Sequence, residues 1–261
     1  MSSVRSRLSA KSRSVLRSLG AGLSSSVREI DVRGVCVRMH VTTDVEDYRV
    51  STYATKEPET LDWIDSTIKP GDVLYDLGAN IGIYSLYAAI KGAVVFAFEP
   101  EALNFAQLNR NIVANPGVNI TPYCIAIGAE RKLTRFYSRE FAAGAACHGL
   151  DRPVDPAGRD FRPAHQQGTM VVTLDELWRD FGLPAPRHIK IDVDGAETDV
   201  LAGGSATLRH GEFASVLVEV TGPAEAIQDR VGHLRLASRG DPMRTSPTYP
   251  SLNHIFVRAG N

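Results

Sequence analysis

The stretch from Pro70 to Pro100 constrains the fold of this chain more than any other part of the sequence. Two short apolar runs, Val73–Leu77 and Ala93–Phe98, flank the longer apolar run Ile83–Ile90, which has the length of a helix. Glycines follow the first run, and the acid Glu99 follows the last. This order of strand, glycine turn, helix, strand and acid predicts a βαβ unit.

The glycine turn of this unit predicts a binding site for a nucleoside cofactor. Gly78 and Gly82 let the backbone approach a ligand closely, and the helix after them directs free N–H groups at that ligand. Asp76 precedes the turn, and Glu99, about 20 residues further on, is placed to bind ribose hydroxyls. Asn80 stands where a dinucleotide fingerprint has the glycine that meets a pyrophosphate. That asparagine counts against a nicotinamide cofactor and permits S-adenosylmethionine, which has no phosphate.

Strands and helices keep alternating downstream of this unit. A helix is expected over 101–115. Strands are expected at 118–127, 133–137, 170–173, 188–193, 215–220, 233–237 and 253–257. Such alternation is typical of a doubly wound, mainly parallel α/β sheet of the Rossmann-like kind. Ahead of it, a strand pair within 29–56 and a helix over 60–68 are expected to form a small N-terminal strand/helix extension.

Polar residues at the carboxyl ends of the predicted strands should meet in one crevice, because doubly wound sheets bind ligands there. Asp76, Glu99 and Ala126 stand at such ends, and so do Asp192 and Asp194. The candidate cofactor-binding residues are Asp76, Gly78, Asn80, Gly82, Glu99, Ala126 and Asp192.

The segment around Asp192 allows three chemical interpretations. Asp192, Asp194 and Glu197 could supply a general base, hold a metal ion, or cap the helix that starts after Gly195. No histidine neighbour completes a metal site, so no metal is expected. Lys190 alternates toward a buried face of the strand and is expected to pair with a carboxylate.

Composition argues against several classes of protein. The formal net charge of −1 gives no general attraction for nucleic acid. No apolar run approaches the roughly 18 residues that a membrane-spanning helix needs. Three cysteines without a CxxC spacing argue against a disulfide framework or a zinc site, and they favour a reducing, cytoplasmic compartment.

Two segments depart from the α/β pattern, and the rest of the chain, 29–261, is expected to form one domain. Residues 1–28 are basic and rich in serine, which predicts either a flexible tail or an amphipathic helix that contacts the core, a membrane or a partner. Ser138–Gly168 lacks periodicity and is rich in alanine, glycine, proline and arginine. A loop of that length can be a lid that selects an acceptor.

Several sequence blocks resemble the FkbM-type methyltransferases, and Lys190–Glu197 is the most specific of them. The other blocks are Asp76–Gly82, Phe98–Pro100, the spaced residues Leu108, Asn111 and Asn115, Thr173–Asp175, and Val200, Leu201 and Gly203. The resemblance implies a seven-stranded class I methyltransferase fold, S-adenosylmethionine as donor, and usually O-methylation of a sugar or natural-product hydroxyl. By the same resemblance, the cofactor site is lined by Asp76, Gly78, Asn80 and Glu99, and the methyl group and acceptor lie near Asp192, Asp194 and Glu197.

The sequence therefore favours a methyltransferase that uses S-adenosylmethionine and acts on a small-molecule acceptor such as a sugar, a glycan or a natural product. Asp192 is the first candidate for the catalytic base, ahead of Asp194 and Glu197. Two alternatives stay open here: a nicotinamide-dependent oxidoreductase, and a non-catalytic cofactor-binding protein that docks on a partner through residues 1–28. A homo-oligomer is also compatible with the sequence.

Overall fold

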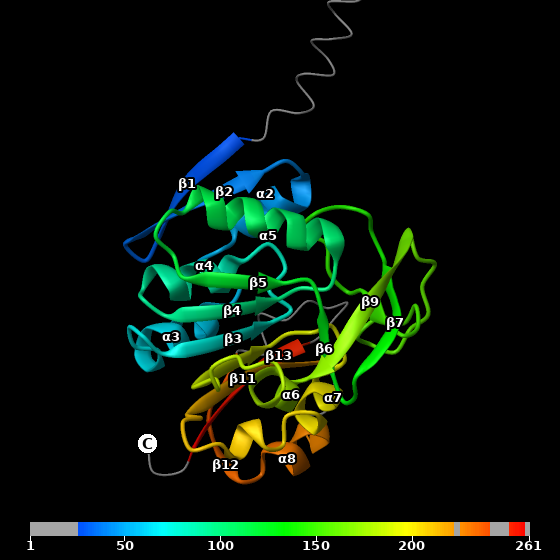
Figure 1. Ribbon diagram of the computed structural model, residues 1–261. Coiled ribbons are helices and arrows are strands. Elements are labelled where there is room, and N and C mark those ends of the chain that lie inside the picture. The colour runs from blue at the N-terminus through cyan, green and yellow to red at the C-terminus, as the bar shows by residue number, and fades with distance from the viewer. Residues whose placement is uncertain (1–25, 222–224, 241–250, 259–261) are drawn as a thin grey trace, which may run out of the picture.

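The main sheet confirms the predicted doubly wound α/β architecture (Figure 1). The computed structural model describes residues 26–221, 225–240 and 251–258, so most of the basic N-terminal segment lies outside the described residues. Within them, seven strands pair in the order β12 (Leu234–Arg239), β13 (Ser251–Arg258), β11 (Ser215–Thr221), β10 (His188–Ile191), β3 (Val73–Leu77), β4 (Val94–Phe98) and β5 (Ile120–Tyr123). The strands from β11 through β5 are parallel, whereas β13 pairs antiparallel with both β11 and β12.

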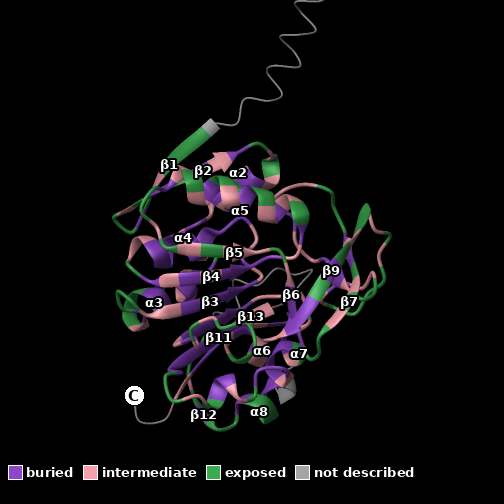
Figure 2. Cartoon of the chain, viewed as in Figure 1, coloured by how far each residue is buried: buried purple, intermediate pink, exposed green. Residues whose placement is uncertain are grey.

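Alternating side chains of these strands pack into two separate hydrophobic cores. Leu74 and Leu217 pack with the helices on one face of the sheet, and their neighbours Tyr75 and Val216 pack with the helices on the other. The first face carries α3 (Pro58–Thr67), α4 (Ile83–Ile90) and α5 (Ala102–Ala114), and the second carries α6 (Leu174–Arg179), α7 (Glu197–Ala202) and α8 (Glu225–Val231). The central strands are mostly buried as a result (Figure 2). The strand ends are therefore where polar side chains can gather.

The predicted strand pair is a hairpin of β1 (Ser26–Val32) and β2 (Val35–Val41), which turns at Arg33 and Gly34. It lies against α5 at one side of the molecule (Figure 1). Three amide side chains, two from α5 and one from Asn115 at its C-terminal end, are spaced four residues apart and bind the β2 backbone: Asn115 binds Arg38, and Asn111 and Gln107 bind His40. That spacing places all three amides on one helix face, so the extension is fixed to the sheet layer.

One helix in this extension, α2 (Asp44–Ser51), differs from the prediction of strand structure within 29–56. The helix begins with a capping box, because Thr43 Oγ1 accepts from Glu46 N and the Glu46 carboxylate accepts from Thr43 N. The Thr-x-x-Glu spacing is visible in the sequence and was the missed signal.

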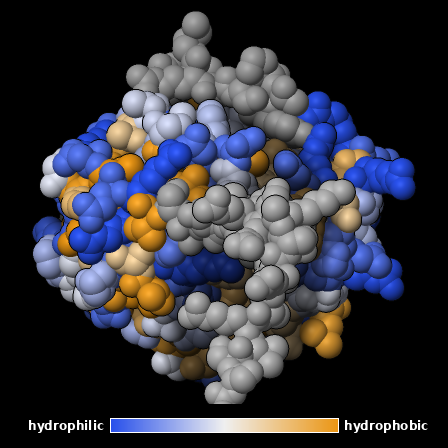
Figure 3. All heavy atoms as spheres, turned by 90° about the horizontal axis from the view of Figure 1, so that it is seen from above, coloured by the Kyte–Doolittle hydropathy of each residue, from blue (hydrophilic) through white to orange (hydrophobic). Residues whose placement is uncertain are grey.

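Viewed from above, the molecule shows hydrophilic and hydrophobic side chains intermixed (Figure 3).

A second sheet of four strands lies beyond the carboxyl ends of the main strands (Figure 1). Its order is β6 (Ala126–Gly128), β9 (His165–Thr173), β7 (Lys132–Ser138) and β8 (Gly149–Leu150). The predicted pairing of 133–137 with 170–173 is confirmed. The predicted strand 118–127 is wrong in extent: the chain leaves the edge strand β5 after Tyr123, and β6 pairs with β9 instead.

Candidate active site

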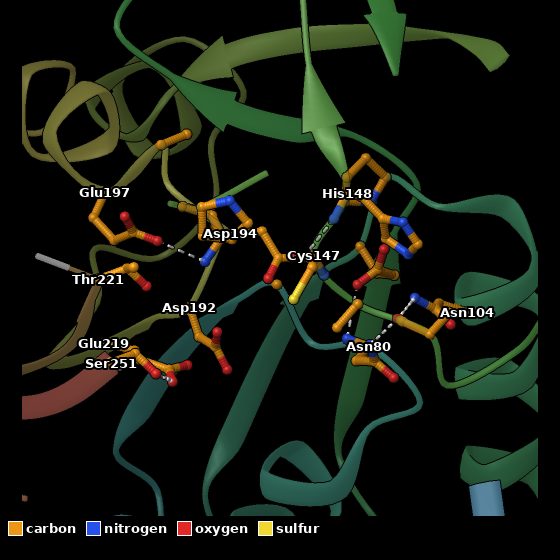
Figure 4. Close-up of a pocket in the computed structure, with 18 of the residues that line it drawn as sticks. Asn80, Asn104, Cys147, His148, Asp192, Asp194, Glu197, Glu219, Thr221 and Ser251 are labelled. Carbon is orange, nitrogen blue, oxygen red and sulfur yellow. Dashed lines mark hydrogen bonds between the residues drawn. The ribbon is translucent and has the colours of Figure 1, made fainter. Parts of the chain in front are cut away.

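A pocket of about 430 Å³ lies at the carboxyl ends of the main strands, where the sequence predicts a crevice. Its walls come from α2 and the chain leading into α3, the glycine turn after β3, the segment between β7 and β9, and the ends of β10, β11 and β13. Figure 4 shows Asp192 and Glu219 on one side, Asn80 and His148 on the other, and Cys147 between them. A pocket of this volume can bury most of a small molecule.

Gly78 is required because two strand ends meet at its Cα atom. A Cβ atom there would lie 1.7 Å from the Asp192 carbonyl oxygen, and the backbone has a φ of 79°. Gly78 therefore brings the ends of β3 and β10 together, and it lines the pocket. Gly82 does not line the pocket; a Cβ atom there would lie 2.5 Å from Leu108, so its smallness serves the packing of α4 on α5.

Glu99, at the end of β4, lines the pocket with only 4% of its surface exposed. Its carboxylate oxygens accept hydrogen bonds from Asn80 N and Glu101 N, each at 2.8 Å. Burial raises the pKa of Glu99 to about 8, and the two backbone N–H groups offset only part of that effect. Each carboxylate oxygen can accept more than one hydrogen bond, so Glu99 can still bind hydroxyl groups of a ligand.

Asn80 lines the pocket, but its amide is engaged within the protein. The residue has a φ of 51°, its Oδ1 accepts from Ile81 N, and its Nδ2 donates to Ala145 O at 2.9 Å. The side chain thus ties the segment between β7 and β9 to the glycine turn. Ala126, at the start of β6, belongs to an apolar part of the same pocket wall.

The sequence predicts Ser138–Gly168 as a loop and candidate lid, but its first residue ends β7, residues 165–168 belong to β9, and β8 lies within it. The connecting segment 139–164 is a fastened wall of the pocket. Asn104 of α5 holds its turn, because Oδ1 accepts from Gly144 N at 2.7 Å and Nδ2 donates to Ala145 O at 3.1 Å. Arg49 of α2 donates to Gly144 O as well. Together with the Asn80 contact, three elements that are distant in sequence hold this segment in place.

His148, in the same segment, presents an unpartnered nitrogen at the pocket wall. Its Nδ1 lies 3.2 Å from Arg139 N, which donates to it, and its Nε2 has no hydrogen-bond partner within the part of the chain that the structure describes. Burial lowers the pKa of His148, and the Glu101 carboxylate opposes that effect. A neutral ring that accepts at Nδ1 carries its proton at Nε2, so this nitrogen can donate to a ligand.

Asp194 and Glu197 both line the pocket, and each also holds local backbone. Asp194, with a φ of 56°, accepts at Oδ2 from Cys147 N and His148 N at 2.8 and 3.2 Å. Glu197 accepts at Oε1 from Gly195 N at 3.0 Å. Burial raises the pKa of Asp194 to about 6 and the pKa of Glu197 to about 7. Both carboxyl groups therefore fasten the turn after β10 while facing the pocket.

Asp192 directly follows β10 and interacts with the charged groups around it. Lys190 Nζ lies 2.8 Å from Asp192 Oδ2, which confirms the expected pairing of this lysine with a carboxylate. Burial acts to raise the pKa of Asp192, but the Lys190 ammonium and a hydrogen bond from Glu219 hold it well below its usual range. The Asp192 side chain keeps 27% of its surface exposed and lines the pocket, so it remains accessible to a ligand.

Asp76 faces a second, smaller cavity of about 30 Å³ rather than the main pocket. Its Oδ2 accepts from Ser85 Oγ, while its Oδ1 is buried without a partner within the described residues. Burial raises the pKa of Asp76, and Lys190 opposes the shift. Gly78, Asn80 and Asp192 line both cavities, so the smaller one is a side chamber of the pocket.

The sequence profile of the Methyltransferase FkbM domain matches residues 76–241, which is more than half of the chain. The chain belongs to the FkbM methyltransferase family. The glycine turn, Glu99 and the turn after β10 all fall within the matched region, so the family match covers most of the pocket described above.

Two curated relatives and one solved structure place this FkbM-family chain among known methyltransferases. It is 27% identical over 205 residues to the hexuronic acid methyltransferase AglP of Haloferax volcanii, with 77% of each chain covered. It is 32% identical over 158 residues to the 31-O-demethyl-FK506 methyltransferase FkbM of Streptomyces tacrolimicus, covering 52% of this chain and 60% of that one. The structure of magnesium protoporphyrin IX methyltransferase from Synechocystis, solved with bound S-adenosylmethionine, matches 84% of this chain and 86% of that one with a TM-score of 0.50 at 15% identity. This likeness confirms the class I fold.

As an FkbM-family methyltransferase, the chain uses S-adenosylmethionine, and the nicotinamide alternative is set aside. The pocket fits this cofactor: Glu99 has acceptor capacity for ribose hydroxyls, and Asp76 has an unpartnered buried oxygen suited to an ammonium group or a water. Arg49 adds a positive charge at the boundary of the two cavities. Within the described residues, no group of three or more His, Cys, Asp or Glu side chains is placed to hold a metal ion.

Sequence reasoning missed many residues of this FkbM-family pocket, among them Arg49, His148, Glu219 and Asn253. Glu219 had a usable signal, because it lies near the carboxyl end of a predicted parallel strand, where ligands bind. Asn253 donates through Nδ2 to Glu59 Oε1 at 3.0 Å, and its Oδ1 lacks a partner within the described residues. Arg49 and His148 had no such signal, because one belongs to the missed helix α2 and the other to an aperiodic segment.

Proposed function

We propose that this chain is an O-methyltransferase that moves a methyl group from S-adenosylmethionine to a hydroxyl of a small-molecule acceptor, such as a sugar, a glycan or another natural product. One observation supports the proposal: the pocket has carboxyl groups at the ends of β10 and β11, beside the ends of β3 and β4. Carboxylates accept hydrogen bonds from hydroxyl groups and can take their protons. The name of the Streptomyces relative, 31-O-demethyl-FK506 methyltransferase, supports the same reaction class.

The cofactor half of the pocket extends over the ends of β3, β4 and the start of β6. In our proposal Glu99 binds the ribose hydroxyls, and Ala126 lies against the nucleoside. Asp76 and Arg49 face the amino and carboxylate groups of the amino-acid part, because one offers a free acceptor oxygen and the other a positive charge. Gly78 and Asn80 shape this half through the backbone contacts described above.

The acceptor half of the pocket extends over the ends of β10, β11 and β13. Methyl transfer from a sulfonium mainly requires that the acceptor oxygen be held in line with the methyl carbon. A hydroxyl is a weak nucleophile, so a carboxylate that takes its proton adds roughly 10²–10⁴-fold. We assign the base to Asp192, with Asp194 and Glu197 behind it, because these two also hold backbone N–H groups.

The acceptor is proposed to be a small molecule rather than nucleic acid, because phosphates favour basic surfaces and this pocket is rich in carboxyl groups. Cys36, Cys124 and Cys147 are all unpaired, which supports a reducing compartment such as the cytoplasm. No helix in the described ranges is long and apolar enough to cross a membrane. Formation of a homo-oligomer stays a prediction from the sequence.

A transfer assay tests the proposed function directly. The full-length protein is incubated with S-adenosylmethionine carrying a deuterated methyl group and with a panel of free sugars, glycosides and polyketide alcohols. Products are analysed by mass spectrometry for a gain of one labelled methyl, and fragmentation locates the methyl on oxygen, nitrogen or carbon. A methyl ether is the expected product. Label found only on nitrogen, carbon or a carboxylate would contradict O-methylation of a hydroxyl.

A further inference from the structure

Asp192 and Glu219 form a directly interacting pair of carboxyl groups on the acceptor side of the pocket. Ile191 of β10 pairs with Val218 of β11, so the next residues, Asp192 and Glu219, are neighbours across the two strands, and Ser251 Oγ donates to Glu219 Oε1. Figure 4 shows these three side chains close together on one wall. Two adjacent carboxylates repel each other when both are ionised, so a pair this close favours the state that holds one proton.

Charges from the surrounding elements decide where that proton resides. The charged and titratable groups that act on the pair are Lys56 and Glu57 at the start of α3, Asp76 of β3, Tyr84 of α4, Cys147 of the pocket wall, Lys190 of β10, and Asp194 and Glu197 after β10. Lys190 contacts Asp192 directly and stabilises its ionised form, so the proton resides on Glu219. Burial and the neighbouring Asp192 charge raise the pKa of Glu219 well above its usual range, which agrees with this placement.

We propose that the Asp192–Glu219 pair is the proton acceptor of the methyl transfer and that its protonation is coupled to the charge on the cofactor sulfur. The inference rests on the proposed O-methylation of a hydroxyl. The pair takes the hydroxyl proton while the bond from the methyl carbon to the acceptor oxygen forms and the bond from the methyl carbon to sulfur breaks. Atoms and charge balance without another reactant, because the pair becomes less negative by one charge as the sulfur loses its positive charge.

The coupling follows from the repulsion between two adjacent carboxylates. Glu219 keeps its proton beside ionised Asp192 unless another positive charge approaches. S-adenosylmethionine carries such a charge on sulfur, and S-adenosylhomocysteine has the same nucleoside and amino-acid parts without it. Binding of the first ligand should therefore expel the shared proton, which leaves the pair ready to accept the proton of a hydroxyl. Binding of the second should leave the shared proton in place.

Proton release on binding tests this inference without any acceptor. The full-length protein is titrated calorimetrically near neutral pH with each of the two ligands, in buffers of different ionisation enthalpy, which gives the number of protons released. We expect S-adenosylmethionine to release about one proton more than S-adenosylhomocysteine. Contributions from Glu99 and from the amino group of the ligand largely cancel, because both ligands engage them alike.

Two matched variants assign the released proton to a residue. Glu219→Gln keeps the shape and can still donate to Asp192, but it has no titrating proton, so the difference between the ligands should vanish. Glu197→Gln removes a different pocket carboxyl, one whose pKa burial raises to about 7, and it should retain the difference. Circular dichroism checks that both variants are folded. If either variant does not fold, proton release by the wild type with the two ligands still tests the inference.

Three results would overturn the inference. These are equal proton release for both ligands in the wild type, a difference that survives in Glu219→Gln, and a difference that Glu197→Gln abolishes. None of them would disprove O-methylation, which the transfer assay measures separately. Conversely, a failed search for methyl ethers would leave the calorimetric result unchanged, so the two failures can be told apart.

Discussion

The two halves of the pocket hold their carboxyl groups in opposite electrostatic settings. In the cofactor half, Glu99 is bound by two backbone N–H groups and forms no ion pair with a described residue, and burial raises its pKa to about 8. In the acceptor half, burial is outweighed by Lys190, which holds the pKa of Asp192 well below its usual range. One carboxyl group therefore depends on a ligand for further hydrogen bonds, whereas the other is already stabilised as an anion.

The contrast shows that the two halves are built from different kinds of neighbour. Glu99 is bound by backbone from the glycine turn and from its own chain two residues later, all within the βαβ region. Asp192 interacts with Lys190 on its own strand and with Glu219 of β11, and Ser251 of β13 supports Glu219. The cofactor half is thus largely local in sequence, and the acceptor half exists only after distant strands have packed.

The pH dependence of stability should separate the two halves most strongly. Folding raises the pKa of Glu99 from 4.5 to about 8. The contribution of Glu99 to the stability of the folded protein is therefore fully present below pH 4.5 and is lost as the pH rises through 8. The low pKa of Asp192 acts in the opposite sense, so its contribution is present above pH 3.8 and lost as the pH falls. Relative to wild type, Glu99→Gln should gain stability between pH 5 and 9, by at most about 4 kcal/mol.

Urea unfolding of the cofactor-free protein at several pH values measures this change. Glu130→Gln is the matched control, because Glu130 is exposed and makes only a surface ion pair with Lys132. If the free energy of unfolding changed with pH in the same way in wild type and in Glu99→Gln, folding would not raise the pKa of Glu99, and the proposed contrast between the two halves would be wrong.

Asp192→Asn tests the acceptor half by removing its fixed anion while keeping the side-chain shape. Turnover should fall about 100-fold or more, because the hydroxyl loses its proton acceptor. Affinity for S-adenosylmethionine should change by less than about tenfold, since Glu99 is untouched. Formation of S-adenosylhomocysteine with the acceptor found in the transfer assay gives the rate. Asp199→Asn makes the same chemical change at an exposed site in α7 and should behave as wild type. Wild-type turnover in Asp192→Asn would remove this residue as the base.

Glu99→Ala makes the corresponding change in the cofactor half. Loss of its charged hydrogen bonds to ribose should weaken cofactor binding by about 1.5–3 kcal/mol. Turnover at saturating cofactor should be affected much less than in Asp192→Asn, which is the reverse of the pattern for the acceptor half. Calorimetry with S-adenosylhomocysteine measures the affinity, and Glu130→Ala controls for removal of a glutamate. An unchanged dissociation constant would contradict the assignment of Glu99 to the ribose.

Asn104→Ala tests the wall that the two halves share. The change removes the donor to Ala145 O and the acceptor for Gly144 N, so the protein should lose about 1–3 kcal/mol of stability. The segment 139–164 should then be cleaved faster by a protease, and binding should weaken in both halves. Asn109→Ala, on the same helix, is the control, because its amide bonds only to the helix carbonyl of Phe105. Unchanged cleavage would mean that Asn104 does not hold the wall.

Ser251→Ala should give the smallest effect, confined to the acceptor half. Glu219 loses one hydrogen-bond donor but keeps its bond to Asp192, so turnover should fall by less than about tenfold. Affinity for S-adenosylhomocysteine should match wild type, because Ser251 lies on β13, away from Glu99. The same rate and binding assays provide the measurement, and a large loss of cofactor affinity would show that the two halves are coupled.

The sequence by itself determined the sheet and the cofactor half. Period-two alternation sends Leu74 and Tyr75 to opposite faces, and the glycine turn with Glu99 forms a unit whose contacts are mostly near in sequence. The rule that parallel strands present ligand sites at their carboxyl ends was enough to place Glu99 and Asp192 on the pocket wall. Ala126 lines the wall too, but from the start of β6 rather than from the end of a main-sheet strand. Local patterns carry this information because strand and helix periodicity depend on neighbouring residues.

Only the tertiary structure decided what these side chains do once they are brought together. It engages the amide of Asn80 with Ala145, uses Gly82 for packing, and turns an apparent loop into a wall. It also joins Asp192 to Glu219 across two strands, a contact that no spacing in the sequence specifies. Hydrogen bonds and charge pairs form between whichever groups packing brings within a few ångströms. The protonation and partners of the acceptor half therefore depend on the completed sheet rather than on any one segment of the chain.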